Sequence, residues 1–338
     1  MLRFLPEKAD KEQSMISRAT PAPSLATLVV PERYNYIATF LTLACNLDCS
    51  YCINLHEDPT QGRGRIISKH MGLEDWVAAI DRIDTQNRVP ITLQGGEPTV
   101  FKHFYGIMER VKPKDFDLLT NLQFDPAEFV KRVPKSHFSR EAPYAPIRVS
   151  YHPGQNTMEE LIPKAKYLQD HGFRVGLYGV MFPAQAEHIL KVQEEAVKAG
   201  LDFRTKEYLG KGAGHLKYAD GVEGTFNKFA MCRTSELLLS PSGYVMRCHS
   251  DLYEGRLPIG HILDPEFRLE DKFRPCTVYR HCNPCDVKIK TNRFQIFGHT
   301  SCDIEGIRGL TGAEEAAVAK GDNGLAGIQR EFQTAPVS

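Results

Sequence analysis

A regular alternation of short apolar runs and amphipathic segments constrains the fold of this chain more than any other feature. Runs rich in β-branched residues, typical of buried strands, begin at residues 36, 91, 117, 147, 174 and 202. The last four intervals between these starts are 26 to 30 residues long. Segments with helical periodicity lie between the runs, at residues 73–83, 104–111, 126–132, 158–170 and 186–199.

Helix-boundary residues support this alternation. Thr157 and Glu160 have the spacing of a capping box, and Gly172 and Gly200 lie where helix C-caps are expected. A strand, a helix and a return strand occupy about 30 residues in parallel α/β proteins. Six successive units therefore predict a parallel sheet, either open and doubly wound or curved into a partial barrel.

Composition limits the class of partner. The 338 residues contain 42 Lys+Arg and 42 Asp+Glu, a balance that argues against binding to nucleic acid or to an anionic membrane surface. No apolar run reaches the 18 residues of a membrane span, and Leu25–Val30 is too short for the core of a signal peptide. We therefore expect a cytoplasmic protein.

The nine cysteines are unevenly distributed. Three lie at Cys45, Cys49 and Cys52, and no cysteine occurs between residues 53 and 231. Stable disulfides are not expected in a reducing compartment, and an odd number cannot pair completely. The distribution predicts two separate metal-binding regions. The second would use the remaining six cysteines, Cys232, Cys248, Cys276, Cys282, Cys285 and Cys302.

The first cysteine group directly follows the first predicted strand. In a parallel α/β fold this places it at the carboxyl edge of the sheet, where such folds have their sites. Three thiolates can bind three irons of a [4Fe–4S] cluster and leave the fourth iron open. The alternative, structural zinc, generally needs four ligands, and His56 is the nearest substitute for a fourth thiolate.

Two motifs resemble those of the radical S-adenosylmethionine (SAM) superfamily. The first is the CxxxCxxC pattern of Cys45, Cys49 and Cys52, with an aromatic residue, Tyr51, before the last cysteine. The second is the Gly-Gly-Glu-Pro sequence at 95–98, just after the second strand. Adjacent glycines allow close backbone approach, and a glutamate can pair with an ammonium group. On these motifs the chain is identified as a member of that superfamily.

The resemblance implies roles for individual residues. The three cysteines would hold the cluster, and the amino and carboxylate groups of SAM would chelate its open iron. Tyr51 would lie near the adenine. The methionyl ammonium would be received by the motif that consists of Gly95, Gly96, Glu97 and Pro98.

Later strand ends offer further candidates for SAM binding. Thr120-Asn121 matches a pair often found after the third strand of the family. Ser150 and His152 occupy the position of a Ser-x-Asp contact to the ribose, and His152 departs from its acidic pattern. On the sixth strand Arg204, Lys206 and Glu207 could face the cavity, with Arg204 and Lys206 on one face.

The implied chemistry comes from the cofactor. An electron from a flavodoxin- or ferredoxin-like reductant protein would enter the cluster, SAM would be cleaved, and a 5′-deoxyadenosyl radical would abstract hydrogen from the substrate. Simple methyl transfer is the alternative use of SAM. The sequence has no Gly-rich strand–helix turn of the kind that ordinary methyltransferases use.

The later cysteines resemble the SPASM and twitch extensions, which house auxiliary iron–sulfur clusters. Cys232, Gly243 and Cys248 match the opening C-x(9–15)-G-x4-C of these extensions. The second half lacks one SPASM cysteine, because Phe273 stands at its place. The resemblance thus implies one or two auxiliary [4Fe–4S] clusters.

Three ligand assignments remain open. One complete cluster could use Cys232, Cys248, Cys282 and Cys285. Two clusters could each use three cysteines with a non-cysteine or open position, near which lie His249, His281, Asp286 and Asp303. A structural zinc site could instead use Cys276, Cys282, Cys285 and Cys302.

We expect an α/β fold, a partial (β/α)6 TIM-like barrel with a small cysteine-rich C-terminal domain. The predicted segments are an extension (1–35), the barrel (36–214), the SPASM/twitch-like domain (215–310) and a tail (311–338). The favoured function is oxidation of a substrate through an auxiliary cluster. Because 35 residues are too few for a peptide-recognition domain, a small molecule is favoured over a peptide. The alternatives are a redox-neutral peptide maturase or epimerase and a non-catalytic iron–sulfur electron carrier.

Overall fold

The computed structural model describes residues 25–49, 52, 70–87, 89–207, 228–254, 258–279 and 302–319. Within these ranges no helix has both the length and the apolar character needed to cross a membrane. Some residues named above lie outside the described residues: Tyr51, His56, His281, Cys282, Cys285 and Asp286.

A curved nine-stranded sheet forms the centre of the molecule, in the order β12-β11-β10-β2-β4-β5-β6-β7-β8. Every neighbouring pair from β10 to β8 is parallel. Because β12 and β8 do not pair with each other, the barrel is partial, as predicted. The six predicted strands are β2 (Tyr36–Phe40), β4 (Ile91–Gln94), β5 (Phe116–Thr120), β6 (Ile147–Tyr151), β7 (Val175–Met181) and β8 (Asp202–Glu207).

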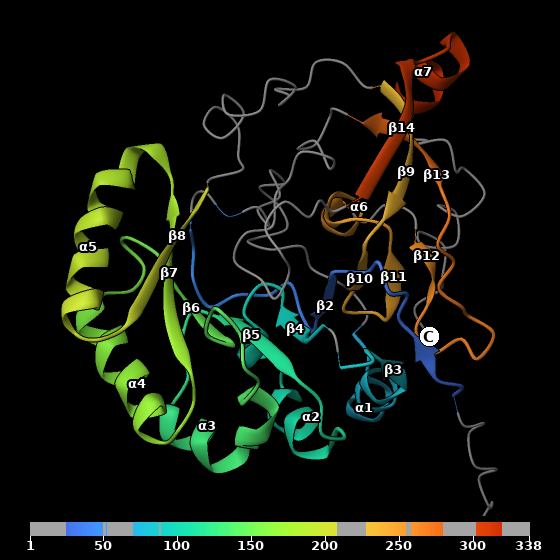
Figure 1. The fold of residues 1–338 in the computed structure, drawn as a ribbon. Helices are drawn as coiled ribbons and strands as arrows, with labels where there is room; N and C mark the ends of the chain where they lie inside the picture. Colours follow the sequence, from blue (N-terminus) through green and yellow to red (C-terminus); the bar gives the residue numbers. More distant parts are fainter. Residues whose placement is uncertain are drawn as a thin grey trace, which may run out of the picture.

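Helices cover the outer face of this sheet (Figure 1). All five predicted helices are present, and the capping box at Thr157 is confirmed, with Thr157 N donating to Glu160 Oε2 at 3.1 Å. The predicted C-cap glycines Gly172 and Gly200 have φ of +85° and +76°. The helices are α1 (Leu73–Arg82), α2 (Phe104–Arg110), α3 (Pro126–Arg132), α4 (Met158–Asp170) and α5 (Ala186–Lys198), with short 3₁₀ turns η1 (Pro98–Val100), η2 (Lys135–Phe138) and η3 (Pro183–Gln185).

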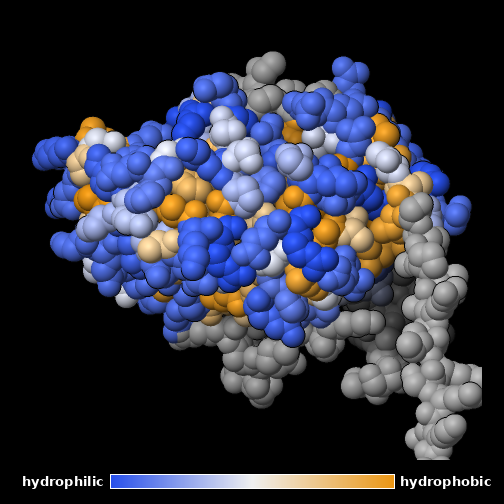
Figure 2. Space-filling view, turned by 90° about the horizontal axis from the view of Figure 1, so that it is seen from below, coloured by the Kyte–Doolittle hydropathy of each residue, from blue (hydrophilic) through white to orange (hydrophobic). Residues whose placement is uncertain are grey.

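Side-chain alternation gives the sheet an apolar outer face and an inner face of mixed character, apolar along β2 and β10 and polar further along the sheet. Outward-facing residues such as Ile37, Leu93 and Leu118 pack with the helices in the main core. The surface around α1 to α3 is mostly hydrophilic, with apolar side chains in small separate groups (Figure 2). The inner face of the sheet carries Gln94, Asp117 and other polar side chains, and it is the face available for a site.

The sequence pattern did not predict how the C-terminal strands join the barrel. β10 (Glu236–Leu239) pairs in parallel with β2, and β11 (Tyr244–Met246) and β12 (Pro258–His261) extend the same sheet. A smaller sheet has the order β13-β9-β14. Its strands are β9 (Lys228–Thr234), β13 (Arg274–Tyr279) and β14 (Cys302–Gly309), and the helices of this part are α6 (His249–Glu254) and α7 (Gly312–Ala319).

The described end of the predicted N-terminal extension is also packed on the barrel. β1 (Leu28–Val29) pairs in parallel with β3 (Ile83–Asp84), which directly follows α1. Leu28 and Val30 are each 1% exposed and belong to the main core. The division of the chain into four segments stays a prediction.

Candidate active site

The first cysteine group lies at the carboxyl end of β2, on the loop that begins after Phe40. Cys49 is buried, whereas Cys45 and Cys52 are exposed. Cys52 N donates to the carbonyl of Cys49 at 3.1 Å, which holds the last two cysteines close together. These three thiols therefore share one loop at the sheet edge where the sequence placed them.

The chemistry of this donor set fits an iron–sulfur cluster. Partial desolvation by the surrounding loop raises the pKa of Cys45 although its side chain reaches the surface, and burial together with the neighbouring Cys52 and Cys45 thiols raises the pKa of Cys49 to about 12. A bound metal centre would displace these protons. Among the described residues no three His, Cys, Asp or Glu side chains gather around a single ion. A cubane cluster makes a different demand, because each thiolate binds a separate iron.

The Gly-Gly-Glu-Pro loop after β4 is hydrogen-bonded to the backbone that leads into the cysteine loop. Gly96 N donates to the Thr42 carbonyl at 3.0 Å, and Glu97 N donates to the Ala44 carbonyl at 2.8 Å. A Cβ at Gly95 or Gly96 would lie 2.0 Å from the carbonyl oxygen of Thr42 or Ala44, respectively. The two glycines are thus required by the close packing of two backbone segments, and this packing brings one predicted motif into direct contact with the other.

The carboxylate of Glu97 is held by donors from the protein. It is 1% exposed and accepts hydrogen bonds from Thr99 N and Oγ1, Thr120 Oγ1 and Asn121 N at 2.6 to 3.1 Å. Burial raises its pKa, which these four hydrogen bonds oppose. These bonds fix the carboxylate in place, and its role toward the methionyl ammonium stays a prediction.

Pro98 has a structural role in the same loop. It is buried and begins the 3₁₀ turn η1, for which Glu97 is the N-cap residue. Proline is favoured at this position, because the first amide of a helical turn needs no intrahelical partner. Within the described part of the chain, no contact of Pro98 points to a ligand.

The Asn121 side chain lies against the cysteine loop. It follows β5 directly and is 4% exposed. Its Nδ2 is 2.7 Å from Asn46 Oδ1 and 3.8 Å from Cys45 Sγ. The structure therefore brings the predicted Thr120-Asn121 pair together with both Glu97 and the first cysteine.

Ser150 and His152 lie at the end of β6, on the same edge of the sheet. Asn156 holds this turn, since His152 N donates to its Oδ1 at 2.8 Å and its Nδ2 donates to the Ser150 carbonyl at 3.1 Å. Burial, with the nearby charge of Lys206, lowers the pKa of His152 to about 4. His152 is consequently a neutral imidazole at physiological pH.

The predicted residues of β8 divide between the two ends of the barrel. Lys206 Nζ lies 4.8 Å from the ring centre of Tyr178, whose hydroxyl has no hydrogen-bond partner among the described residues. Arg204 donates to Asp202 Oδ2 at 2.8 Å and to the Pro143 carbonyl. Arg204 is therefore held at the amino ends of the strands, away from the cysteine loop.

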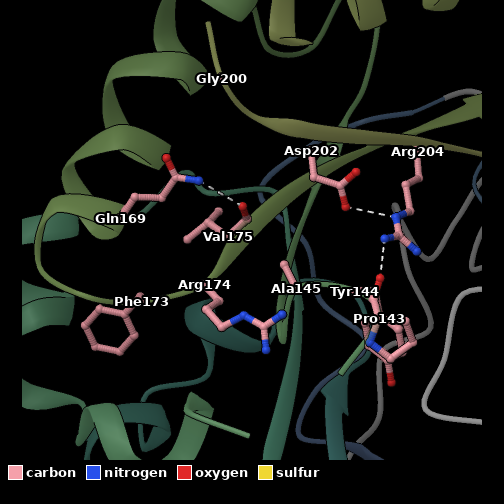
Figure 3. Close-up of a pocket in the computed structure, with 10 residues that line it drawn as sticks. All are labelled: Pro143, Tyr144, Ala145, Gln169, Phe173, Arg174, Val175, Gly200, Asp202 and Arg204. Atoms are coloured by element: carbon pink, nitrogen blue, oxygen red, sulfur yellow. Dashed lines mark hydrogen bonds and ion pairs between the residues drawn. The ribbon is translucent and has the colours of Figure 1, made fainter. Parts of the chain in front are cut away.

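A pocket of about 440 Å³ lies at that opposite end (Figure 3). Its wall comes from the segments just before β6, β7 and β8, and the Asp202–Arg204 ion pair borders it. Active sites of parallel α/β folds lie at the carboxyl ends of the strands. We therefore place the candidate active site at the cysteine loop and not in this pocket.

A buried ion cluster fills the barrel interior near the pocket. Asp117 is 1% exposed and forms ion pairs with Arg140 and with Arg148, the latter at 2.9 Å. The hydroxyl of Tyr144 donates to its Oδ2 at 3.1 Å. The interior of the barrel near the amino ends of its strands is therefore charged and hydrogen-bonded.

The sequence analysis did not predict a series of hydrogen-bonded polar side chains that connects β2 and β4 with α6 and β10. Tyr36 Oη donates to Gln94 Oε1 at 3.0 Å, Gln94 Nε2 is 3.4 Å from His249 Nε2, and His249 Nδ1 is 3.1 Å from Glu236 Oε2. Because an amide nitrogen only donates, His249 accepts at Nε2 and donates from Nδ1. The available signals were the positions of Gln94 before Gly95 and of His249 after Cys248.

Three of the later cysteines come together at the smaller sheet. The thiols of Cys232 and Cys276 are hydrogen-bonded, an interaction that with burial raises the pKa of Cys232. Cys248 interacts electrostatically with Cys232. The buried guanidinium of Arg247 interacts with all three thiols and pairs with Asp251 at 2.7 Å. These contacts join the first two cysteines of the extension to Cys276.

The strand register separates Cys302 from Cys276. Cys276 lies opposite Ala230 on β9, and Cys302 lies opposite Thr234 from the other side. Their Cα atoms are thus about 13 Å apart along the sheet and about 10 Å apart across it. Two sulfurs on one zinc are at most about 4.6 Å apart. The zinc site with both Cys276 and Cys302 is therefore wrong for this arrangement.

Two of the predicted neighbouring ligands are occupied by protein contacts. His249 uses both ring nitrogens, as described above, and Asp303 pairs with Arg33 and Arg233, each at 2.8 Å. These contacts are to protein groups and give no support to a role for either side chain as a cluster ligand. The assignments to Cys282, Cys285, His281 and Asp286 fall outside the described residues.

Comparison with solved structures gives only distant likenesses. Twenty solved chains match. The chain is similar to native anSMEcpe with bound AdoMet, at TM-score 0.47 and 16% identity over 68% of this chain and 78% of that one. It is also similar to Streptococcus suis SuiB bound to precursor peptide SuiA, at TM-score 0.43 and 14% identity over 71% and 64%. Both TM-scores lie below 0.5.

Comparison with protein families is more informative. Among curated protein sequences none matches the chain. A family profile described as the radical SAM superfamily matches residues 39–196, from β2 to α5. The matched range contains both motifs that the fold holds together at the carboxyl edge of the sheet. Residues 39–196 therefore form a radical SAM domain, a family that uses a [4Fe–4S] cluster and SAM as cofactors.

Proposed function

We propose that this chain is a radical SAM enzyme that oxidises its substrate with the help of an auxiliary iron–sulfur cluster. The observation that carries this proposal is the direct attachment of the Gly-Gly-Glu-Pro loop to the backbone before Cys45. Two hydrogen bonds of 2.8 and 3.0 Å join them. This attachment fixes a SAM-binding loop and a cluster-binding loop relative to each other.

The residues of the chain would divide the work at this edge of the sheet. Cys45, Cys49 and Cys52 would hold the cluster, and the backbone of residues 95–97 would receive the methionyl ammonium. Ser150, with the neutral His152 beside it, would bind the ribose. When bound, the cluster and SAM supply a 5′-deoxyadenosyl radical that removes a hydrogen atom from the substrate.

The C-terminal thiols support the oxidative part of the proposal. Cys232, Cys248 and Cys276 lie together, and Arg247 places a buried positive charge beside them. Such a group can hold a second cluster, whose further ligands would come from outside these three cysteines. An auxiliary cluster supplies an electron acceptor for the substrate radical, so the net reaction would be an oxidation. The reductant would be flavodoxin- or ferredoxin-like, and the substrate a small molecule or a peptide.

Reductive cleavage of SAM tests the catalytic part. We expect the reconstituted enzyme to produce 5′-deoxyadenosine under reduction and the Cys45/Cys49/Cys52→Ala variant to produce none. The variant should retain its circular-dichroism spectrum, because none of these three cysteines belongs to either hydrophobic core. Iron binding without any SAM cleavage by the wild type would instead favour a non-catalytic electron carrier.

A further inference from the structure

The side-chain amide of Asn121 is directed at a candidate cluster ligand. Its Nδ2 lies 3.8 Å from Cys45 Sγ, within hydrogen-bond distance for a sulfur acceptor, and 2.7 Å from Asn46 Oδ1. An NH₂ group has two hydrogens, so one donor can serve each acceptor. The amide thus reaches a sulfur of the cysteine loop from a different element of the fold.

The hydrogen-bond pattern determines which end of the amide faces the sulfur. Asn121 Oδ1 accepts from Gln123 N at 3.0 Å, which requires oxygen at that position. The nitrogen is therefore the atom that faces Asn46 and Cys45. A flipped amide would place two oxygens against each other at Asn46.

Glu97 holds the backbone from which this amide projects. Its Oε2 accepts from Asn121 N at 2.6 Å, and its Oε1 accepts from Thr120 Oγ1 at 2.9 Å. The same carboxylate binds Thr99 on its own loop. One buried group thus ties the ends of β4 and β5 together directly behind the amide.

Backbone strain next to Asn121 points to a constrained turn. Leu122 is fully buried and has φ of +58°, a left-handed conformation that is unusual for a bulky residue. Leu122 N donates to Thr120 Oγ1 at 3.0 Å, and Lys164 Nζ donates to the Leu122 carbonyl at 3.1 Å. Strained residues persist where surrounding contacts hold them, and they concentrate at functional sites.

We propose that Asn121 is a positioning residue that donates an N–H···S hydrogen bond to the Cys45 thiolate and thereby raises the reduction potential of the cluster. Hydrogen bonds to cluster sulfurs are among the groups that set such potentials. The reduced cluster is more negative than the oxidised one, so a donor stabilises it more. Glu97 acts through Asn121 by fixing the turn. This inference rests on the proposed function, since it requires a cluster on Cys45.

The test is an EPR-monitored redox titration of the reconstituted enzyme. The signal that changes on addition of SAM identifies the cluster with an open iron. Asn121→Leu removes the donor, and Asn121→Asp keeps the shape but replaces the donor by an acceptor. At the wild-type midpoint potential, the ratio of reduced to oxidised cluster should fall about tenfold in Asn121→Leu, equivalent to 59 mV for one electron. The fall should be larger in Asn121→Asp, because this variant also places a negative charge beside the sulfur.

A matched control is Asn35→Asp. Asn35 is 8% exposed and donates to Ser235 Oγ at 3.2 Å, and it lies just before β2, at the opposite end from Cys45. Its variant should keep the wild-type midpoint potential. An unchanged or raised potential in both Asn121 variants would overturn the inference, even if their SAM affinity falls. Absence of a SAM-responsive signal from the wild type would overturn the proposed function and this inference together.

Discussion

Replacement of Gly96 by alanine should separate the Gly-Gly-Glu-Pro loop from the cysteine loop. The new Cβ would lie 2.0 Å from the Ala44 carbonyl oxygen and 2.5 Å from that of Leu43. Both obstacles are backbone atoms, which cannot move aside as the end of a flexible side chain can. Since contacts under 3.0 Å are essentially never seen for a Cβ, the loop would have to retreat by about 1 Å.

The cost of this retreat follows from the contacts it breaks. Hydrogen bonds of 3.0 Å from Gly96 N and 2.8 Å from Glu97 N would both be lost. At about 1 kcal/mol each they account for about 2 kcal/mol. Overpacking adds about 1–3 kcal/mol. We therefore expect Gly96→Ala to lower the free energy of unfolding by about 3–5 kcal/mol. A displacement of about 1 Å can also lower a catalytic rate about 100-fold.

Urea unfolding, SAM affinity and the rate of 5′-deoxyadenosine formation would measure these effects. Gly312→Ala is the matched control, because a Cβ there has nothing within 4 Å and the glycine has no left-handed backbone. Wild-type stability of Gly96→Ala would refute the close approach of the two loops. A destabilised variant with wild-type SAM affinity and cleavage would show that the packing is right and that its link to SAM is wrong.

Three further outcomes are expected. Asp117→Asn should lower the free energy of unfolding, measured in urea, by about 3–5 kcal/mol, because it leaves two buried arginines without their carboxylate. The control Glu187→Gln changes an exposed ion pair with Lys191 and should leave the midpoint of urea unfolding unchanged. The pKa of His152 is lowered to about 4 in the folded protein, so between pH 6.5 and 4 only the unfolded chain gains this proton, and the free energy of unfolding falls on acidification. Between pH 7 and pH 5 the free energy of unfolding should therefore fall by about 2 kcal/mol less in His152→Asn than in the wild type. Equal falls would contradict a buried neutral imidazole. Iron analysis after anaerobic reconstitution should show that Cys276→Ser loses the auxiliary cluster and Cys302→Ser keeps it; the reverse result would reject the grouping of Cys276 with Cys232 and Cys248.

Local patterns in the sequence determined the barrel and the position of its first site. The period of apolar residues distinguishes strands from helices, and short helix-spanning connections force successive strands to lie parallel. These rules placed the residues after β2 and β4 at one edge of the sheet. The spacing of Cys45, Cys49 and Cys52 is local in the same sense, because three ligands on one short loop need no knowledge of the rest of the fold.

Contacts between distant residues could be decided only by the tertiary structure. The pairing of β10 with β2 joins residues 200 positions apart, and β10 carries the Glu236 that contacts His249. The partners of Glu97 depend on how β5 ends beside β4, and the separation of Cys276 from Cys302 depends on strand register. Residue type and spacing indicate which groups a side chain can bind. Which partner it meets is set by the packing of whole strands and helices, whose energy is spread over many apolar contacts far from the site.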